Sequence, residues 1–104
     1  MDLQALLREL KTRLEELYGD RLRGVYLFGS YARGEATSDS DIDVAMVLDD
    51  FDYVSTEIRR SNPIAADLSL KYDCLLALLP VSETEWQRQT SALAGNLRRE
   101  AVPV

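Results

Sequence analysis

The N-terminal segment carries a leucine pattern that predicts an amphipathic helix over residues 2–18. Its apolar residues recur at spacings of three and four, which places them on one face of a helix. They are Leu3, Leu6, Leu7, Leu10, Leu14 and Leu17. Charged side chains fill the other face, and Gly19 supplies a C-terminal stop signal. We expect this helix to pack on the core through its leucines, which is a structural role.

Three short apolar segments are predicted to be strands, at residues 24–28, 41–48 and 72–79. The first is rich in strand-forming residues and is followed by Gly29. The second begins with alternating polar and apolar residues and then becomes fully apolar, as in a strand that emerges at the edge of a sheet. The third is apolar on both faces apart from Asp73, and Pro80 is expected to end it.

Two further segments carry helix signals. Residues 52–71 are expected to be helical, with a break or kink near Pro63, because proline lacks the N–H that a helix interior needs. Ser82 and Glu85 have the spacing of a capping box, which predicts a last helix over residues 82–94.

The predicted elements alternate between helix and strand, which indicates an α/β (α+β) domain with a small mixed sheet flanked by helices. A length of 104 residues is typical of one domain, so we expect a single domain over residues 1–104 with its core at about 22–80. Gly95 is expected to close the last helix and leave a C-terminal tail.

Composition narrows the chemistry that the chain can perform. Hydrophobic residues make up 46% and charged residues 29%, the balance of an ordinary globular protein. There is no histidine and one cysteine, Cys74, which excludes imidazole chemistry, thiolate zinc sites and a disulfide within the chain. Carboxylates are the remaining metal ligands, and they favour a hard cation such as Mg²⁺ or Mn²⁺.

The distribution of charge points to a localised site. The net charge of −6 argues against broad, unspecific binding of nucleic acid. Residues 39–52 hold six aspartates and no lysine or arginine, so this stretch is either a solvated loop or a cation site. No apolar stretch approaches the roughly 20 residues that cross a bilayer, and we expect a cytoplasmic protein without a membrane segment.

Asp41 and Asp43 are two residues apart on a predicted strand, so their side chains should lie on the same face. Two adjacent carboxylates repel each other unless a cation lies between them. Mg²⁺ is usually bound by one or two carboxylates together with phosphate oxygens. The pair therefore predicts a metal and a phosphate-bearing ligand, although solvated ends of an edge strand are the alternative.

Asp73 interrupts an apolar strand, where an uncompensated charge is costly. If that strand lies beside the one with Asp41 and Asp43, the three carboxylates can hold two metals about 3.5–4 Å apart for in-line displacement at phosphorus. Asp73 would then ligate the second metal and accept a proton from the attacking hydroxyl. Alternatively Asp73 is a solvated residue at the start of the strand, and Asp67 takes the role.

Gly29 and Ser30 lie between a predicted buried strand and a helix start that Ser30 is expected to cap. Backbone N–H groups at such a turn can point at an anion, and glycine lets a phosphate approach the main chain. Arg33, one turn further on, could pair with phosphate oxygens. The structural alternatives are a common Gly-Ser turn and a solvated arginine.

Residues 27–36, Leu-Phe-Gly-Ser-Tyr-Ala-Arg-Gly-Glu-Ala, followed by residues 38–44, Ser-Asp-Ser-Asp-Ile-Asp-Val, resemble the minimal nucleotidyltransferases of the DNA polymerase beta superfamily. That family pattern is hydrophobic-Gly-Ser, a spacer, then Asp-hydrophobic-Asp, with a third carboxylate on a later strand. The resemblance covers the chain from about Val25 to Leu79 and implies the polymerase-beta-like fold.

The resemblance also implies roles for individual residues. Gly29 and Ser30 would hold the nucleoside triphosphate, with Ser40 assisting at the phosphate. Asp41 and Asp43 would hold two Mg²⁺ ions, and Asp73 would be the third carboxylate.

Small members of this family often pair with a helical HEPN-domain toxin. The resemblance therefore implies that the chain transfers a nucleoside monophosphate, AMP from ATP, onto a hydroxyl group. The implied acceptor is a tyrosine of such a toxin, so that the chain would act as a type VII-like antitoxin. Two alternatives stay open: a non-catalytic antitoxin or interaction module that neutralises a partner by binding, and a regulatory nucleotide-binding domain. An oligomer is also compatible with the sequence.

Overall fold

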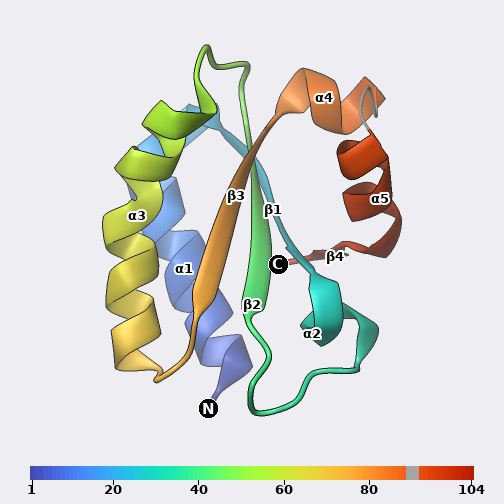
Figure 1. The fold of residues 1–104 in the computed structure, drawn as a ribbon. Coiled ribbons are helices and arrows are strands. Elements are labelled where there is room, and N and C mark those ends of the chain that lie inside the picture. Colours follow the sequence, from blue (N-terminus) through green and yellow to red (C-terminus); the bar gives the residue numbers. More distant parts are fainter. Residues whose placement is uncertain (89–91) are drawn as a thin grey trace.

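The computed structural model describes residues 1–88 and 92–104 (Figure 1). Its helices are α1 (Leu3–Tyr18), the short 3₁₀ turn η1 (Gly19–Arg21), α2 (Gly29–Arg33), α3 (Val54–Lys71), α4 (Glu83–Arg88) and α5 (Ala92–Glu100). Its strands are β1 (Leu22–Phe28), β2 (Ile42–Leu48), β3 (Leu76–Ser82) and β4 (Val102–Pro103). Within the described residues, no helix is long and apolar enough to cross a membrane.

The strands form one mixed sheet in the order β3-β2-β1-β4. Strand β1 pairs antiparallel with β2 and with β4, whereas β2 and β3 run parallel. The parallel pair is connected through α3, as a parallel crossover requires. The prediction of an α/β fold with a small mixed sheet flanked by helices is confirmed.

Helices cover both faces of the sheet, but unequally (Figure 1). Helices α1 and α3 cover one face and bury a large apolar core with the strands. The leucine face of α1 forms part of this core, as predicted, and Asp2 caps the helix by accepting a hydrogen bond from the Ala5 N–H at 3.1 Å. Leu17 is the exception, at 41% exposed, because Tyr18 takes the buried position instead.

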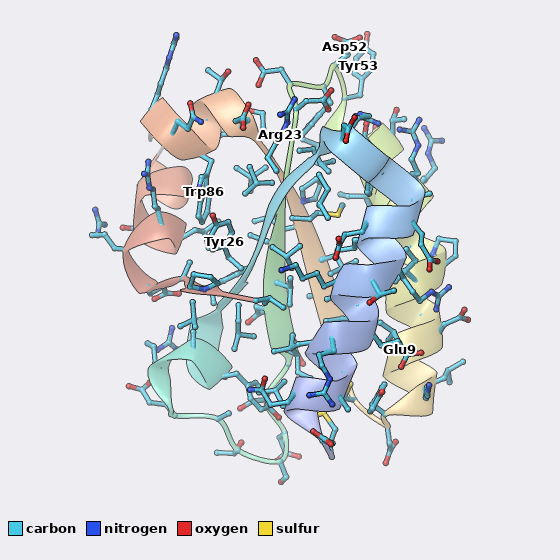
Figure 2. All side chains as sticks on the ribbon, turned by 180° about the vertical axis from the view of Figure 1, so that it is seen from behind. Glu9, Arg23, Tyr26, Asp52, Tyr53 and Trp86 are labelled. Atoms are coloured by element: carbon cyan, nitrogen blue, oxygen red, sulfur yellow. The ribbon has the colours of Figure 1, made fainter. Side chains whose placement is uncertain are left out.

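The opposite face carries a smaller apolar core beneath α4 and α5. Trp86 of α4 stacks on Tyr26 of β1 with ring centroids 4.6 Å apart, as Figure 2 shows. Ala45, Val47, Val81 and Leu97 complete this cluster. The N-terminal end of β2 lies beyond this cluster, and this end carries the carboxylate pair.

The third strand differs from its prediction. It was expected at residues 72–79, but β3 spans Leu76–Ser82, and Pro80 lies inside it instead of ending it. The sheet order makes β3 an edge strand, where a proline without an N–H is tolerated. Asp73 precedes the strand and adopts φ 51°, so it belongs to the turn that follows α3.

Helix α3 also differs from its prediction because it continues through Pro63 without a break. Ser61, Ile64, Ala65 and Leu68 are buried on its inner face. Tertiary packing on the sheet therefore outweighs the local cost of the proline.

The C-terminal region is not one helix followed by a tail. The predicted cap is present, since the Glu85 N–H donates to the Ser82 hydroxyl at 3.2 Å. However, α4 ends at Arg88, residues 89–91 lie outside the described part, and α5 runs through a buried Gly95 to Glu100. The predicted stop at Gly95 is wrong, because this segment packs inward through the buried Leu97.

The last residues pair with the sheet as β4. The Val104 N–H donates to the Val25 carbonyl at 2.9 Å, and the Lys11 ammonium donates to the Val104 carbonyl at 3.0 Å. These bonds hold the end of α5, and with it Glu100, close to β1.

Candidate functional site

The carboxylate pair lies where β2 begins. Ile42 is fully buried in the core beneath α1 and α3, and its N–H donates to the Leu75 carbonyl at 2.9 Å. Because side chains alternate along a strand, Asp43 faces the side opposite to Ile42, and Asp41 directly precedes the strand, close enough to raise the pKa of Asp43. Asp41 is exposed and Asp43 is half-buried.

Asp43 is electrostatically strained in a way that a cation would relieve. Burial raises the pKa of Asp43, and the nearby Asp41 and Glu100 carboxylates raise it further, while Arg33 acts in the opposite direction. Both effects disfavour the negative charge of Asp43. A pair of oxygen ligands in such a position fits a hard divalent cation.

Gly29 brings the turn after β1 directly against Asp43. Its φ is 74°, and a Cβ at this position would lie 2.5 Å from the Asp43 Oδ2 atom. No residue with a side chain fits there without moving the carboxylate. The two halves of the sequence motif, Gly-Ser and Asp-x-Asp, are therefore in contact in the folded chain.

Ser30 lies inside α2 and is not its cap. The helix begins at Gly29, with Phe28 in the capping position and no side-chain capping bond. The Ser30 carbonyl accepts from the N–H groups of Gly34 and Glu35, and Gly34 ends the helix with φ 72°. The predicted capping role of Ser30 is wrong, but the Gly29-Ser30 turn is adjacent to Asp43.

Glu100, which the sequence interpretation placed in a tail, reaches into this region. Its Oε1 atom accepts a hydrogen bond from the Gly29 N–H at 3.2 Å. The Arg33 Nη1 atom lies 3.4 Å from Glu100 Oε2 and 3.5 Å from Oε1. Two donors that the sequence assigns to phosphate oxygens are therefore bound to a carboxylate of the same chain.

Arg33 is held by a second carboxylate as well. Its Nε donates to Glu35 at 3.2 Å, and the bonds to Glu35 and Glu100 raise the pKa of Arg33. The guanidinium is therefore fixed next to Gly29 and stays charged. A signal for Glu100 exists in the sequence, since Leu93 and Leu97 continue a helical spacing beyond Gly95.

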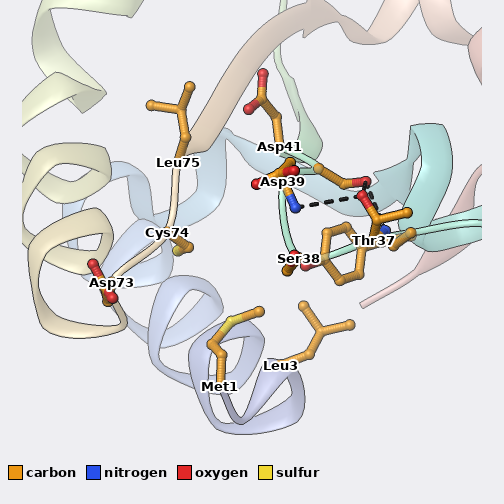
Figure 3. Close-up of a pocket in the computed structure, with 12 residues that line it drawn as sticks. Met1, Leu3, Thr37, Ser38, Asp39, Asp41, Asp73, Cys74 and Leu75 are labelled. Carbon is orange, nitrogen blue, oxygen red and sulfur yellow. Dashed lines mark hydrogen bonds between the residues drawn. The ribbon is translucent and has the colours of Figure 1, made fainter.

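A cavity of about 470 Å³ lies beside Asp41, between the start of α1, the loop before β2 and the turn after α3 (Figure 3). Its lining includes Tyr31, Ser40, Asp41 and Asp73. Gly29, Asp43 and Glu100 are not part of this lining. The cavity therefore meets the carboxylate pair only at Asp41, and the Gly29 side of the pair is a separate surface.

Ser40 shapes the loop that leads to Asp41. Its hydroxyl accepts from the Thr37 N–H at 2.9 Å, and its N–H donates to the Thr37 carbonyl at 3.1 Å. These bonds close a turn between α2 and β2 (Figure 3). Ser40 therefore positions the loop, and its side chain also borders the cavity.

Asp73 does not join the carboxylate pair. It lies in the turn before β3, and Figure 3 shows its side chain across the cavity from Asp41, beyond Cys74. In the part of the chain that the structure describes, no group of three acidic, histidine or cysteine side chains is arranged to hold a metal. The predicted convergence of three carboxylates is thus not realised.

Asp67, the alternative to Asp73, is no substitute. It lies on α3, and its carboxylate forms an ion pair with Arg13 of α1 at 3.2 Å. Both helices cover the face of the sheet that buries Ile42, opposite to Asp43.

Comparison with known proteins agrees with the motif and the fold. Residues 7–95 match the family model of the nucleotidyltransferase domain. Protein adenylyltransferase MntA of Thermococcus cleftensis is 33% identical over 75 residues, covering 72% of this chain and 74% of that protein.

Two solved complexes share the fold. A toxin–antitoxin structure with AMP-PNP aligns with a TM-score of 0.63 at 22% identity, covering 90% of this chain and 68% of that one. A tri-AMPylated Shewanella oneidensis HEPN toxin in complex with an MNT antitoxin aligns with a TM-score of 0.58 at 18% identity, covering 96% and 69%.

Proposed function

Because the chain belongs to the nucleotidyltransferase domain family, we propose that it transfers AMP from ATP onto a hydroxyl group of a partner protein. The observation that carries this proposal is the contact between Gly29 and Asp43, where a Cβ would lie 2.5 Å from the carboxylate oxygen. This contact joins a phosphate-binding turn to a metal-binding pair within one site.

Asp41 and Asp43 are the residues that would hold Mg²⁺ in this site. When bound, the cation neutralises charge on the phosphate oxygens and aligns them for displacement. Asp43, half-buried beside Gly29, fixes the position of the pair relative to the turn. Asp41, exposed at the cavity, faces the side from which an acceptor can approach.

The Gly29 N–H and the Arg33 guanidinium are the donors for the triphosphate, with Ser30 beside them. Both donors point to one place, because Glu100 already bridges them. A triphosphate oxygen would replace the Glu100 carboxylate there. In the transfer, the acceptor oxygen bonds to the α-phosphorus, the bond to the β-phosphate oxygen breaks, pyrophosphate leaves, and the hydroxyl proton passes to solvent.

The partner we propose is a HEPN-domain toxin, with a tyrosine as acceptor, so that the chain acts as an antitoxin in the cytoplasm. Support comes from the names of similar proteins: a protein adenylyltransferase among the relatives, and a HEPN toxin with its MNT antitoxin among the structures of the same fold. The exposed carboxylate Asp41 is compatible with a protein acceptor, since the cavity beside it is open.

A second candidate function is neutralisation of the partner by binding alone. Two observations favour it: Glu100 occupies the proposed phosphate donors, and the described residues contain no group of three carboxylates arranged to hold a metal. A chain that acts in this way would need the partner surface but not the nucleotide.

The experiment that separates the two candidates uses ATP labelled at either the α- or the γ-phosphate, with Mg²⁺ and the protein encoded by the neighbouring gene. Nucleotidyl transfer leaves α-label, but no γ-label, on a tyrosine of the partner. Asp43→Asn should abolish the label. Partner inhibition without label, equal in wild type and Asp43→Asn, would instead establish binding alone.

A further inference from the structure

The strand next to the carboxylate pair presents no third ligand at the position where one could reach the metal. Strands β2 and β3 are parallel and in register, so Asp43 is paired with Ala77 and Ile42 with Leu76. Leu76 and Ile42 are both buried in the core beneath α1 and α3. Ala77 and Asp43 therefore face the same, opposite side, and paired residues lie about 4.8 Å apart across a ladder.

Ala77 is open to the site. It is exposed, and Leu75, two residues earlier, is 60% exposed. Since β3 is an edge strand, no further strand follows on that side. A carboxylate at residue 77 would therefore lie next to Asp43 without displacing any buried group, but the side chain there is a methyl group.

Three other carboxylates lie away from the β3 side of the pair. Asp73 lies in the turn before β3, and Asp67 is paired with Arg13 on the far face of the sheet. Glu100 lies on the β1 side of Asp43, bound to the Gly29 N–H and to Arg33. None of them occupies the β3 side of the pair.

The ligand count decides how many cations the site can hold firmly. One Mg²⁺ is satisfied by one or two carboxylates together with phosphate oxygens and water, which Asp41, Asp43 and a triphosphate supply. A second ion about 3.5–4 Å away repels the first and needs negative ligands of its own. On the β3 side of the pair, where residue 77 is an alanine, water and shared phosphate oxygens would be its ligands.

We propose that the nucleotide-loaded site binds one divalent cation tightly, in place of the two expected from the sequence, and that Ala77 is the residue that sets this number. The inference rests on the proposed function, because it assumes that Asp41 and Asp43 bind a metal with a triphosphate.

The test counts bound Mn²⁺ by electron paramagnetic resonance in the presence of an ATP analogue that cannot be cleaved between its α- and β-phosphates. Wild type should bind one Mn²⁺ per chain tightly. Ala77→Asp should gain a second, with its affinity raised at least about tenfold because one charged ligand is added. Ala77→Asn, of the same size without the charge, should remain at one.

Two tight ions in the wild type, or no gain in Ala77→Asp, would overturn the inference. If Ala77→Asp does not fold, Ala77→Glu provides the same charge at longer reach, and the wild-type count decides on its own. Failure of the proposed function gives a different result: neither Mn²⁺ nor the analogue binds to any variant, and Asp43→Asn changes nothing.

Discussion

The two faces of the sheet differ in how much apolar surface they bury. Among the described residues, the face beneath α1 and α3 buries fourteen apolar residues in one cluster, whereas the face beneath α4 and α5 buries five. The second face leaves the start of β2 uncovered, and Asp41, Asp43 and Gly29 lie there. The first face stabilises the fold, and the second face carries the residues of the proposed site.

The two faces also differ in how their charged side chains are paired. On the first face, each acidic side chain in an ion pair has a cationic partner of its own region, as in the 2.9 Å bond between Lys71 and Glu9. On the second face, burial and the nearby Asp41 and Glu100 carboxylates raise the pKa of Asp43, and Arg33, which pairs with Glu100, lowers it only in part. In the proposed function, a bound metal would neutralise this unbalanced negative charge.

The largest effect is expected from Asp43→Asn, which tests whether the second face is functional. Transfer should fall by at least about 10³-fold, because a lost metal ligand removes several kcal/mol of charge stabilisation. The fold should remain intact or become slightly more stable. Single-turnover transfer and thermal melting of the same sample check this, and a variant with normal transfer would remove Asp43 from the metal site.

The same variant has a predicted pH dependence. The folded state raises the pKa of Asp43, so this residue favours folding at low pH, and that contribution is lost as the pH rises through the raised pKa. Wild type should therefore lose stability relative to Asp43→Asn as the pH rises above the ordinary aspartate range. An unchanged difference across that range would contradict the strained carboxylate.

Leu10→Ala is the corresponding test on the first face, where a substitution should affect stability and not transfer. Leu10 is fully buried in α1, so truncation should cost about 2–5 kcal/mol of unfolding free energy. Transfer per folded molecule should stay unchanged at a temperature where the variant is folded. Urea unfolding and an activity assay measure the two quantities, and a selective loss of activity would show that the faces are not separable.

Gly29→Ala should combine a small stability loss with a binding defect. A φ of 74° strains any side chain by about 1–3 kcal/mol, and the added Cβ would displace the Asp43 carboxylate. Gly34→Ala is the control, because Gly34 has φ 72° but no atom within 4 Å of an added Cβ. Both variants should lose a similar amount of stability, but only Gly29→Ala should weaken metal-dependent nucleotide binding. Equal nucleotide binding in the two variants would argue against the Gly29–Asp43 contact.

The smallest effect is expected from Glu100→Gln. Removing the charge that competes for the Gly29 N–H and Arg33 should tighten nucleotide binding by a factor of about 3–10, which corresponds to the net contribution of one ordinary hydrogen bond. Glu35→Gln is the control, since Glu35 also pairs with Arg33 but has no bond to Gly29. Calorimetry with an ATP analogue measures the affinity of each variant. Weaker binding in Glu100→Gln would contradict this competition and show that Glu100 supports nucleotide binding.

The difference between the faces also separates what the sequence predicts from what it does not. The leucine spacing of α1 and the alternation at Ile42 identify buried positions directly, because each position is decided by a local period. That Gly29 and Asp43 belong to one site is implied by the resemblance of their motif to the nucleotidyltransferases. These features appear in the structure where the sequence places them.

Other features depend on contacts between distant segments, and these were predicted incorrectly. Glu100 reaches Gly29 only because β4 pairs with β1, which no local pattern indicates. Asp73 was placed on a strand because it adjoins an apolar run, but the run starts pairing at Leu76 and leaves Asp73 in a turn. Strand register, and not hydrophobicity, therefore decides which carboxylates meet.

The most direct test of the account is whether the Gly29 turn and the carboxylate pair form one site. The melting temperature of the wild type should be measured with Mg²⁺ alone, with a non-cleavable ATP analogue alone and with both. If phosphate oxygens complete the coordination of a metal on Asp41 and Asp43, the shift with both should exceed the sum of the separate shifts, and Asp43→Asn should abolish the excess. Additive shifts in the wild type would contradict a shared site.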